Sequence, residues 1–514
     1  MIDMKETLLM SVDLGTSFIK AGVYNPDSIC VAESSEPVRD YRPAPGIFIQ
    51  KGDELFDSVL TCIKSVCVLI GDRAAHVEAI AFTGQMAGFM GVSKDWDDIT
   101  TWSCSLDSRY MPYADRQMIE LKDSFYSISG TNFPQMAPKF AWFSNEFPDK
   151  AKKIAKYLMI SGYVIGRIGG LSIDEAIMDK SYTSWTGLAD VQNGTWSSEI
   201  CSAVGINQEN LPKIVDCNTV CGRLSPEYAV LTGLKSGIPL VAGAGDKIAG
   251  CLGSATVEDG EMVLEASSYG EISCCVSDFR PDITERRFDI LPSAIPGKFF
   301  ATHFAAGSGI TLDWFVNNFA KSSNQDLGEA FKKLEKEIVN LKPGCDGLTA
   351  IGLLGGSSMP SDGDLRGMWM GFDWSHKPEH FYRALIESYT YDFSLAINRV
   401  KALYPEYNSP VVKMIGGGAK SPAWLQMSAD IEGKDYVTVN RKDVSMWGAC
   451  ILAGNAVGLF KDMRETAKQH IKIKEIYKPD PSRKNIYEKQ RDLYGQLLTE
   501  LRTFYQRIAQ IKGD

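Results

Sequence analysis

Two glycine-containing turns in the sequence combine backbone freedom with carboxylates and hydroxyls. The first holds Asp13, Gly15, Thr16, Ser17 and, three residues later, Lys20. A carboxylate, two hydroxyls and a glycine that admits close backbone approach are the groups that hold hydrated Mg²⁺ and phosphate oxygens together. Lys20 adds a cation. The alternative interpretation is a hairpin tip whose aspartate bonds its own backbone.

Asp246 is the carboxylate of the second turn. It follows Gly243 and Gly245 at the end of the apolar segment 238–242. A strand that ends in such a turn presents the carboxylate, and the glycines leave room for a substrate hydroxyl at hydrogen-bond distance. Asp246 is therefore a candidate general base. A helix N-cap aspartate explains the same residues equally well.

The densest glycine cluster of the chain joins the apolar segment 411–415 to a predicted helix. Its residues are Gly416, Gly417, Gly418, Ala419, Lys420, Ser421 and Pro422. A serine N-cap and a proline in the first turn suit a helix start whose free NH groups face a nucleotide. Ala419 stands where a Walker A motif requires glycine, so this is not a P-loop. A tight strand-to-helix turn without a ligand is the alternative.

Two further segments carry groups suited to a ligand with several hydroxyls. Gln85 and Met86 follow a short apolar strand, and Asp107 and Arg109 lie in the segment 102–109. Amide, carboxylate and guanidinium groups bind sugar-like molecules through multiple hydrogen bonds. An internal ion pair between Asp107 and Arg109 is the competing interpretation.

The composition is that of an ordinary globular protein, with 44% hydrophobic and 23% charged residues. The 514 residues include 54 basic and 64 acidic side chains, a net charge of −10. This balance argues against binding of nucleic acid or anionic lipid. No export signal precedes Asp13, so a cytoplasmic protein is expected. The uncharged stretch 444–460 is short for a membrane span and is better explained as a buried helix.

The elements that must position these residues alternate between strand and helix, which predicts an α/β protein. Strand–turn–strand patterns occur at 7–25 and again at 261–276, with short strands at 78–82 and 411–415 and a helix at 151–165. The small and polar residues 253–260 resemble a hinge. We therefore predict domains at 1–253 and 260–480, followed by an amphipathic helix at 481–514 that packs on the second domain.

The order of the motifs along the chain is more specific than any one of them. They are the segments 13–20, 84–86, 106–109, 137–139, 243–246 and 416–421. This succession resembles the FGGY carbohydrate kinases, particularly their xylulose-kinase-like branch. The resemblance implies two actin-like, ribonuclease-H-like ATPase domains around a central cleft. The first would bind mainly sugar and the second mainly ATP, and a homodimer is an arrangement left open.

The resemblance also implies a role for individual residues. Asp246 would be the base on the sugar hydroxyl, and Asp13 would support Mg²⁺ together with Asp246. The region 417–419 would meet the adenine nucleotide, while Thr16 and Lys20 would face its phosphates. Ser267, in the second strand–turn–strand pattern, would add a hydroxyl on the phosphate side.

The sequence departs from the family pattern mainly on the substrate side. Ala87 replaces the histidine usual in xylulose kinases, Ile49 replaces an acidic residue, and Ala266 replaces a glycine. A lost polar partner changes substrate discrimination strongly. The expected activity is phosphorylation of a ketose, foremost a pentulose. A kinase for a polyol or sugar acid, a catalytically weak sugar and nucleotide sensor, and an actin-like ATPase are the alternatives.

Overall fold

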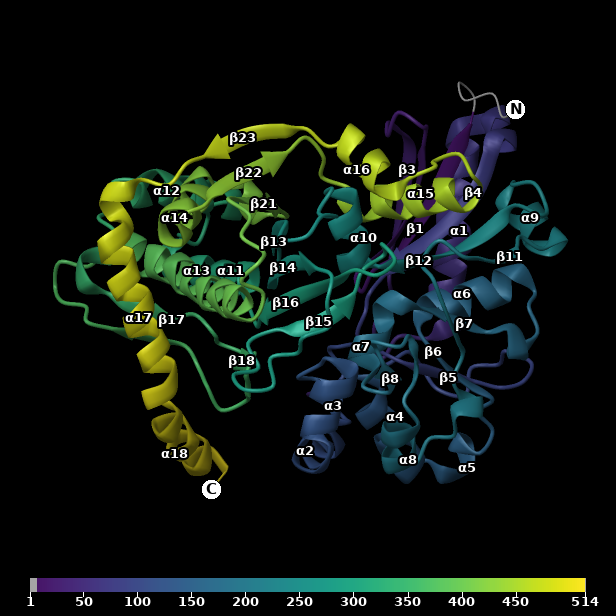
Figure 1. The fold of residues 1–514 in the computed structure, drawn as a ribbon, viewed down its shortest axis with the longest axis horizontal. Helices are drawn as coiled ribbons and strands as arrows, with labels where there is room; N and C mark the ends of the chain where they lie inside the picture. The colour runs from purple at the N-terminus through teal and green to yellow at the C-terminus, as the bar shows by residue number, and fades with distance from the viewer. Residues whose placement is uncertain (1–6, 514) are drawn as a thin grey trace.

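The computed structural model describes residues 7–513 and places two sheet-centred units side by side (Figure 1). The first unit is built on a six-stranded sheet. Its strands, in spatial order, are β11 (Val220–Arg223), β12 (Pro239–Gly245), β4 (Val77–Gly84), β1 (Leu8–Leu14), β2 (Phe18–Tyr24) and β3 (Cys30–Pro37).

The second unit is built on a seven-stranded sheet. Its strands, in spatial order, are β15 (Asp289–Pro292), β16 (Phe299–Ala305), β14 (Gly270–Val276), β13 (Met262–Ala266), β21 (Val411–Ile415), β22 (Asp435–Val439) and β23 (Ile473–Tyr477). Mixed α/β architecture is thus confirmed, with a separate sheet in each half of the chain.

The two sheets share a local design. Strand β1 pairs antiparallel with β2 and parallel with β4, while β13 pairs antiparallel with β14 and parallel with β21. The two predicted strand–turn–strand units are therefore confirmed as hairpins, as are the strands predicted at 78–82 and 411–415. Below, β1–β2 is called the first hairpin and β13–β14 the second hairpin.

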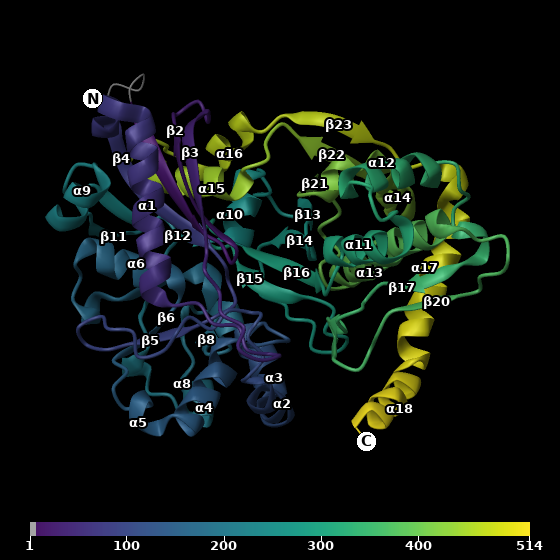
Figure 2. The same cartoon turned by 180° about the vertical axis from the view of Figure 1, so that it is seen from behind.

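Helices cover both faces of the first sheet. Helix α1 (Gly52–Ile70) packs against β2 and β3, and α15 (Val444–Ala456) packs against β1 and β4 on the opposite face (Figures 1 and 2). The uncharged stretch near 444–460 is therefore largely a buried helix, as predicted. Among residues 7–513, no helix is long and apolar enough to cross a membrane.

Helix α15 comes from the second half of the chain but lies against α10 (Asp246–Gly253) of the first half. The two backbones almost touch, because a Cβ at Gly448 would lie 1.9 Å from the carbonyl oxygen of Ala249. A Cβ at Gly253 would lie 1.8 Å from the carbonyl oxygen of Val444. This close approach fixes the middle and the end of α10 relative to α15.

The units also contact each other beside β15. Asp289 on this strand is buried and accepts hydrogen bonds from three donors of the first unit. These donors are the Thr131 hydroxyl (3.0 Å), the Asn132 backbone NH (2.7 Å) and the Trp185 indole NH (3.0 Å). The linker 254–260 lies between α10 and β13, where the hinge was expected.

Two helix predictions were wrong in their extent. Residues 151–165 contain strand β6 (Lys156–Leu158), which pairs with β5 (Met90–Val92), and helix α6 begins only at Ile160. The C-terminal segment forms two helices, α17 (Lys484–Glu500) and α18 (Arg502–Gly513). Only α17 packs closely on α13 (Pro378–Leu403) and α14 (Pro422–Glu432), while Phe504 and Ile508 on α18 are exposed.

Candidate active site

The carboxyl ends of three neighbouring strands bring Asp13 and Asp246 to one edge of the first sheet. In the parallel register of β1, β4 and β12, Leu14 and Gly245 both lie opposite Gly84. Asp13 precedes Leu14, and Asp246 begins α10 directly after Gly245. The sheet therefore joins two predicted site residues that are 233 positions apart in the chain.

Burial disfavours the charge of both carboxylates. Burial raises the pKa of Asp246 well above its usual range, and the negative charges of Asp13 and Glu265 raise it further. Burial likewise raises the pKa of Asp13 to about 6, although Lys20, its cross-strand partner, partly offsets this. Asp246 also accepts a hydrogen bond of 2.8 Å from the Lys247 backbone NH.

These electrostatics bear on the predicted magnesium site. Mg²⁺ keeps several waters and is typically held by one or two carboxylates together with substrate phosphates. Asp13 and Asp246 form a donor set of that kind, and a cation between them would lower the raised pKa of each. Among residues 7–513, no group of three or more His, Cys, Asp or Glu side chains is arranged to hold a metal by itself.

The turn of the first hairpin contacts the predicted substrate residue Gln85. The Thr16 hydroxyl donates to Gln85 Oε1 (3.2 Å), and the Gln85 backbone NH donates to the Leu14 carbonyl (3.1 Å). Gln50 Nε2 donates to the Thr16 carbonyl (2.8 Å). Gln85 Nε2 and Gln50 Oε1 are buried and have no hydrogen-bond partner in the described part of the chain. Both atoms therefore lack the partner that a buried polar atom normally has, and a ligand hydroxyl would supply one.

Met86 is buried beneath the turn that presents Asp246. A Cβ at Gly245 would lie 2.4 Å from Met86 Cγ, so only glycine leaves room for this side chain. Met86 thus packs against the turn that positions Asp246, the candidate general base.

Asp107 and Arg109 form the internal ion pair that was the competing interpretation. Arg109 Nε and Nη2 lie 2.8 Å and 2.7 Å from the two carboxylate oxygens of Asp107, which is fully buried. The guanidinium also lies over the Trp142 ring, 4.5 Å from its centroid. This ion pair holds the end of the segment 102–109 in place.

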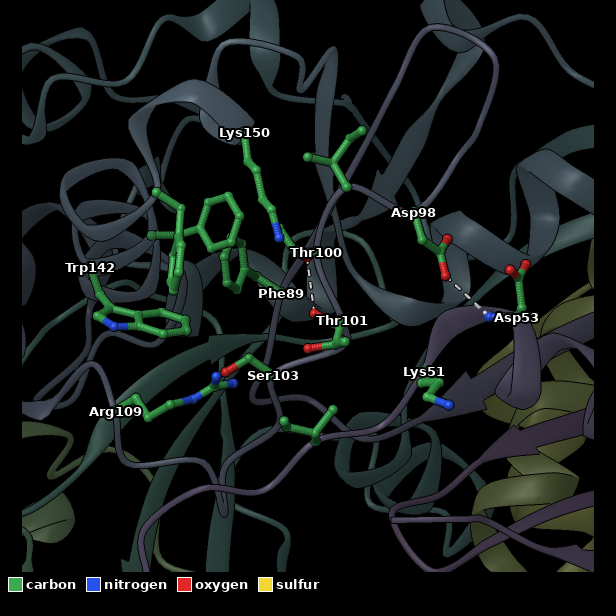
Figure 3. A pocket seen from close by; sticks show the side chains of 14 residues that line it. Lys51, Asp53, Phe89, Asp98, Thr100, Thr101, Ser103, Arg109, Trp142 and Lys150 are labelled. Carbon is green, nitrogen blue, oxygen red and sulfur yellow. Dashed lines mark hydrogen bonds between the residues drawn. The ribbon is translucent and has the colours of Figure 1, made fainter. Parts of the chain in front are cut away.

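Arg109 lines a cavity of about 410 Å³ in the first unit (Figure 3). Arg109 and Trp142 lie on one side of this cavity, and Lys51 and Asp53 lie on the other. Gln85, Met86, Asp13 and Asp246 do not line it. The structure therefore places Arg109 at a cavity that these four predicted site residues do not line.

The glycine cluster lies against the second hairpin. Gly416 has a φ of 84°, and a Cβ there would lie 2.6 Å from Ser267 Oγ and 2.8 Å from the Ala266 carbonyl oxygen. Ser421 caps α14, because its hydroxyl accepts the Trp424 NH (3.0 Å). The structure thus brings together Ser267 and the cluster 416–419, for which only the family resemblance predicts a shared role.

A further glycine-rich turn beside the second hairpin was missed. Gly307, Ser308 and Gly309 lead into α11 (Gly309–Phe315), and the NH groups of Gly309 and Ile310 donate to the carbonyls of Ser267 and Ser268 (both 3.0 Å). The Ser308 hydroxyl is buried and has no hydrogen-bond partner within residues 7–513. The Gly-Ser-Gly run between a strand and a helix is the sequence pattern that could have indicated this turn.

Comparisons with known proteins agree with this geometry. Models of the FGGY family of carbohydrate kinases match residues 8–253 (N-terminal domain) and 282–457 (C-terminal domain). A xylulose kinase of Bacillus subtilis is 26% identical over 496 residues, which cover 96% of each chain. A gluconokinase of the same species is 28% identical over 465 residues, which cover 88% of each chain. The crystal structure of xylulose kinase from Rhodospirillum rubrum shares the fold, with a TM-score of 0.88 at 21% identity over 97% of this chain and 100% of that one.

Fold and site together define a two-domain sugar kinase with the actin-like ATPase fold. Because the two family models cover well over half of the sequence, the chain belongs to the FGGY family of carbohydrate kinases. The family resemblance inferred from the motifs is confirmed.

Proposed function

We propose that the protein transfers the terminal phosphoryl group of ATP to a hydroxyl of a small ketose, foremost a pentulose. The observation that supports this best is the meeting of Asp13, Gln85 and Asp246 at one sheet edge. The second hairpin approaches this edge, since its Glu271 and Glu265 lie 3.5 Å and 4.0 Å from the ammonium nitrogen of Lys247, the residue after Asp246.

Asp246 is the proposed general base. It accepts the proton of the sugar hydroxyl, whose oxygen then attacks the terminal phosphorus in line with the departing diphosphate oxygen. The raised pKa of Asp246 makes this carboxylate a stronger proton acceptor than an exposed aspartate. When bound, Mg²⁺ would be held by Asp13 and Asp246 and would neutralise part of the phosphate charge.

The other predicted residues divide between the two ligands. We assign Gln85 and Met86 to the sugar side. Asp107 and Arg109 pair with each other beside a cavity that Gln85 and Met86 do not line, so they would act on the sugar only indirectly. On the nucleotide side, backbone NH groups at the glycine turns suit phosphate oxygens. We assign this side to Gly15, Thr16, Ser17, Lys20, Ser267, Gly416, Gly417, Gly418 and Ala419.

A sugar acid is the second candidate substrate. A gluconokinase is among the relatives, at an identity similar to that of the xylulose kinase. Ala87 also lacks the side chain that a histidine would offer to a ketose hydroxyl. This candidate keeps the same reaction and the same base.

Measurement of ADP release over a panel of pentuloses, hexuloses, polyols and hexonates tests the proposal. We expect one class to stimulate ADP release far above the sugar-free rate. Thermal stabilisation by a sugar without any ADP release would favour a sensor instead. Rapid ATP hydrolysis that no sugar alters would favour an actin-like ATPase.

A further inference from the structure

Lys247, the residue after the proposed base, reaches from the first unit to the second hairpin. Its side chain is only 4% exposed. The ammonium nitrogen lies 3.5 Å from Glu271 Oε2 and 4.0 Å from Glu265 Oε2. It also donates to the Glu271 backbone carbonyl (3.5 Å). A buried cation of α10 thus meets two carboxylates of the other unit.

The two hairpins differ at equivalent positions. In the first, Asp13 lies opposite Lys20, so a negative charge faces a positive one. In the second, Glu265 is likewise the residue before the last of its strand, but it lies opposite Glu271. Like charges directly opposite each other destabilise a strand pair. Lys247 supplies the missing cation from outside the hairpin.

The glutamates lie where the proposed nucleotide site needs little negative charge. Glu265 is 34% exposed and accepts a hydrogen bond of 3.1 Å from the Ser267 hydroxyl, beside the turn at Gly416. Glu271 is 13% exposed, and its Oε1 has no hydrogen-bond partner in the described chain. Without Lys247, two uncompensated carboxylates would lie next to a triphosphate.

We propose that Lys247 is a positioning residue for the nucleotide, which neutralises Glu265 and Glu271 so that an anionic triphosphate can lie against the second hairpin. The inference rests on the proposed function, which assigns the nucleotide to this hairpin. Because Lys247 extends from the helix that begins with Asp246, the same ion pairs hold the turn of the base against the nucleotide side.

Calorimetric titration of the full-length protein with ATP and with adenosine tests this role. Lys247→Met should weaken ATP binding by at least about tenfold, because it leaves like charges side by side. Adenosine carries no phosphate, so its affinity should stay within about twofold of the wild type. Unchanged ATP affinity, or an equal loss for both ligands, would overturn the inference.

A double variant separates neutralisation from direct phosphate contact. Lys247→Met combined with Glu271→Gln removes one positive and one negative charge, so ATP affinity should recover most of its loss. Failure to recover would contradict the neutralising role and point to a lysine that touches phosphate.

A third variant guards against misfolding of Lys247→Met. Glu271→Gln alone should bind ATP about two- to fivefold more tightly, with adenosine unchanged, because one repelling charge is gone. Equal or weaker ATP binding would overturn the inference. If the wild-type protein itself bound no ATP, the proposed function would fail first, so the two failures are distinguishable.

Discussion

Asp13 and Asp246 are buried carboxyl groups whose charged forms are disfavoured in the folded protein, and this opposes folding wherever they ionise. A carboxyl group whose pKa is raised by folding binds its proton more tightly in the folded state, so its contribution to stability falls as pH rises. For Asp13, this loss of stability occurs as the pH rises from 3.8 to about 6. Active sites commonly sacrifice stability in this way for function.

We therefore expect Asp246→Asn to raise the melting temperature of the ligand-free protein at pH 7, by about 1–3 °C. The amide removes one of the two repelling charges and keeps the shape. Differential scanning calorimetry at pH 7 and pH 4 checks this. The gain should shrink at pH 4, and a variant less stable than wild type at pH 7 would refute the electrostatic account.

Glu265 leads to a second prediction, which concerns the pH dependence of activity. Burial, Asp13 and then Glu265 raise the pKa of Asp246, and a base must be deprotonated to act. Glu265→Gln should lower that pKa, so the acidic limb of the pH profile of kcat/KM moves to lower pH. A limb that stays in place or moves upward would show that Glu265 does not act on the base.

At the scale of elements, the glycine turns decide where the second hairpin and α14 meet. Gly416 requires a positive φ and a close approach to Ser267, whereas Gly417 has a φ of −65° and a Cβ there would lie 3.7 Å from the Ala266 oxygen. Gly416→Ala should weaken ATP binding and lower stability by about 1–3 kcal/mol. Gly417→Ala, the matched control, should change stability little. Calorimetric unfolding and nucleotide titration compare the two, and equal effects would contradict this role of Gly416.

Local chemistry determined much of what could be predicted about these elements. Turn residues and apolar strands indicated both hairpins, and Ser421 with Pro422 indicated the start of α14. The helix expected at 151–165 failed because Tyr157 pairs with Gly91 in another strand, a partner that periodicity cannot show. Lys247 and Glu265 were missed for the same reason, since their meaning depends on contacts between the two halves of the chain.

At the scale of the whole molecule, the contacts that hold the units around the site include the α10–α15 packing, the hydrogen bonds to Asp289 and the ion pairs of Lys247. The first admits a direct test. Gly448→Ala should destabilise the protein by at least about 3 kcal/mol, because a Cβ there meets backbone. Gly250→Ala, also at this helix pair, places its Cβ 3.8 Å from Val444 and should be neutral or stabilising. Denaturant unfolding of both variants would contradict the account if their stabilities were equal.

The central claim is that this kinase transfers phosphate to a sugar hydroxyl through Asp246. Its most direct test is the turnover of Asp246→Ala, measured as sugar-dependent ADP release with the best substrate, beside ATP affinity by calorimetry. We predict that turnover falls by about 10²–10⁴ while ATP still binds, as for removal of a positioned base. Near-normal turnover in this variant would contradict the claim.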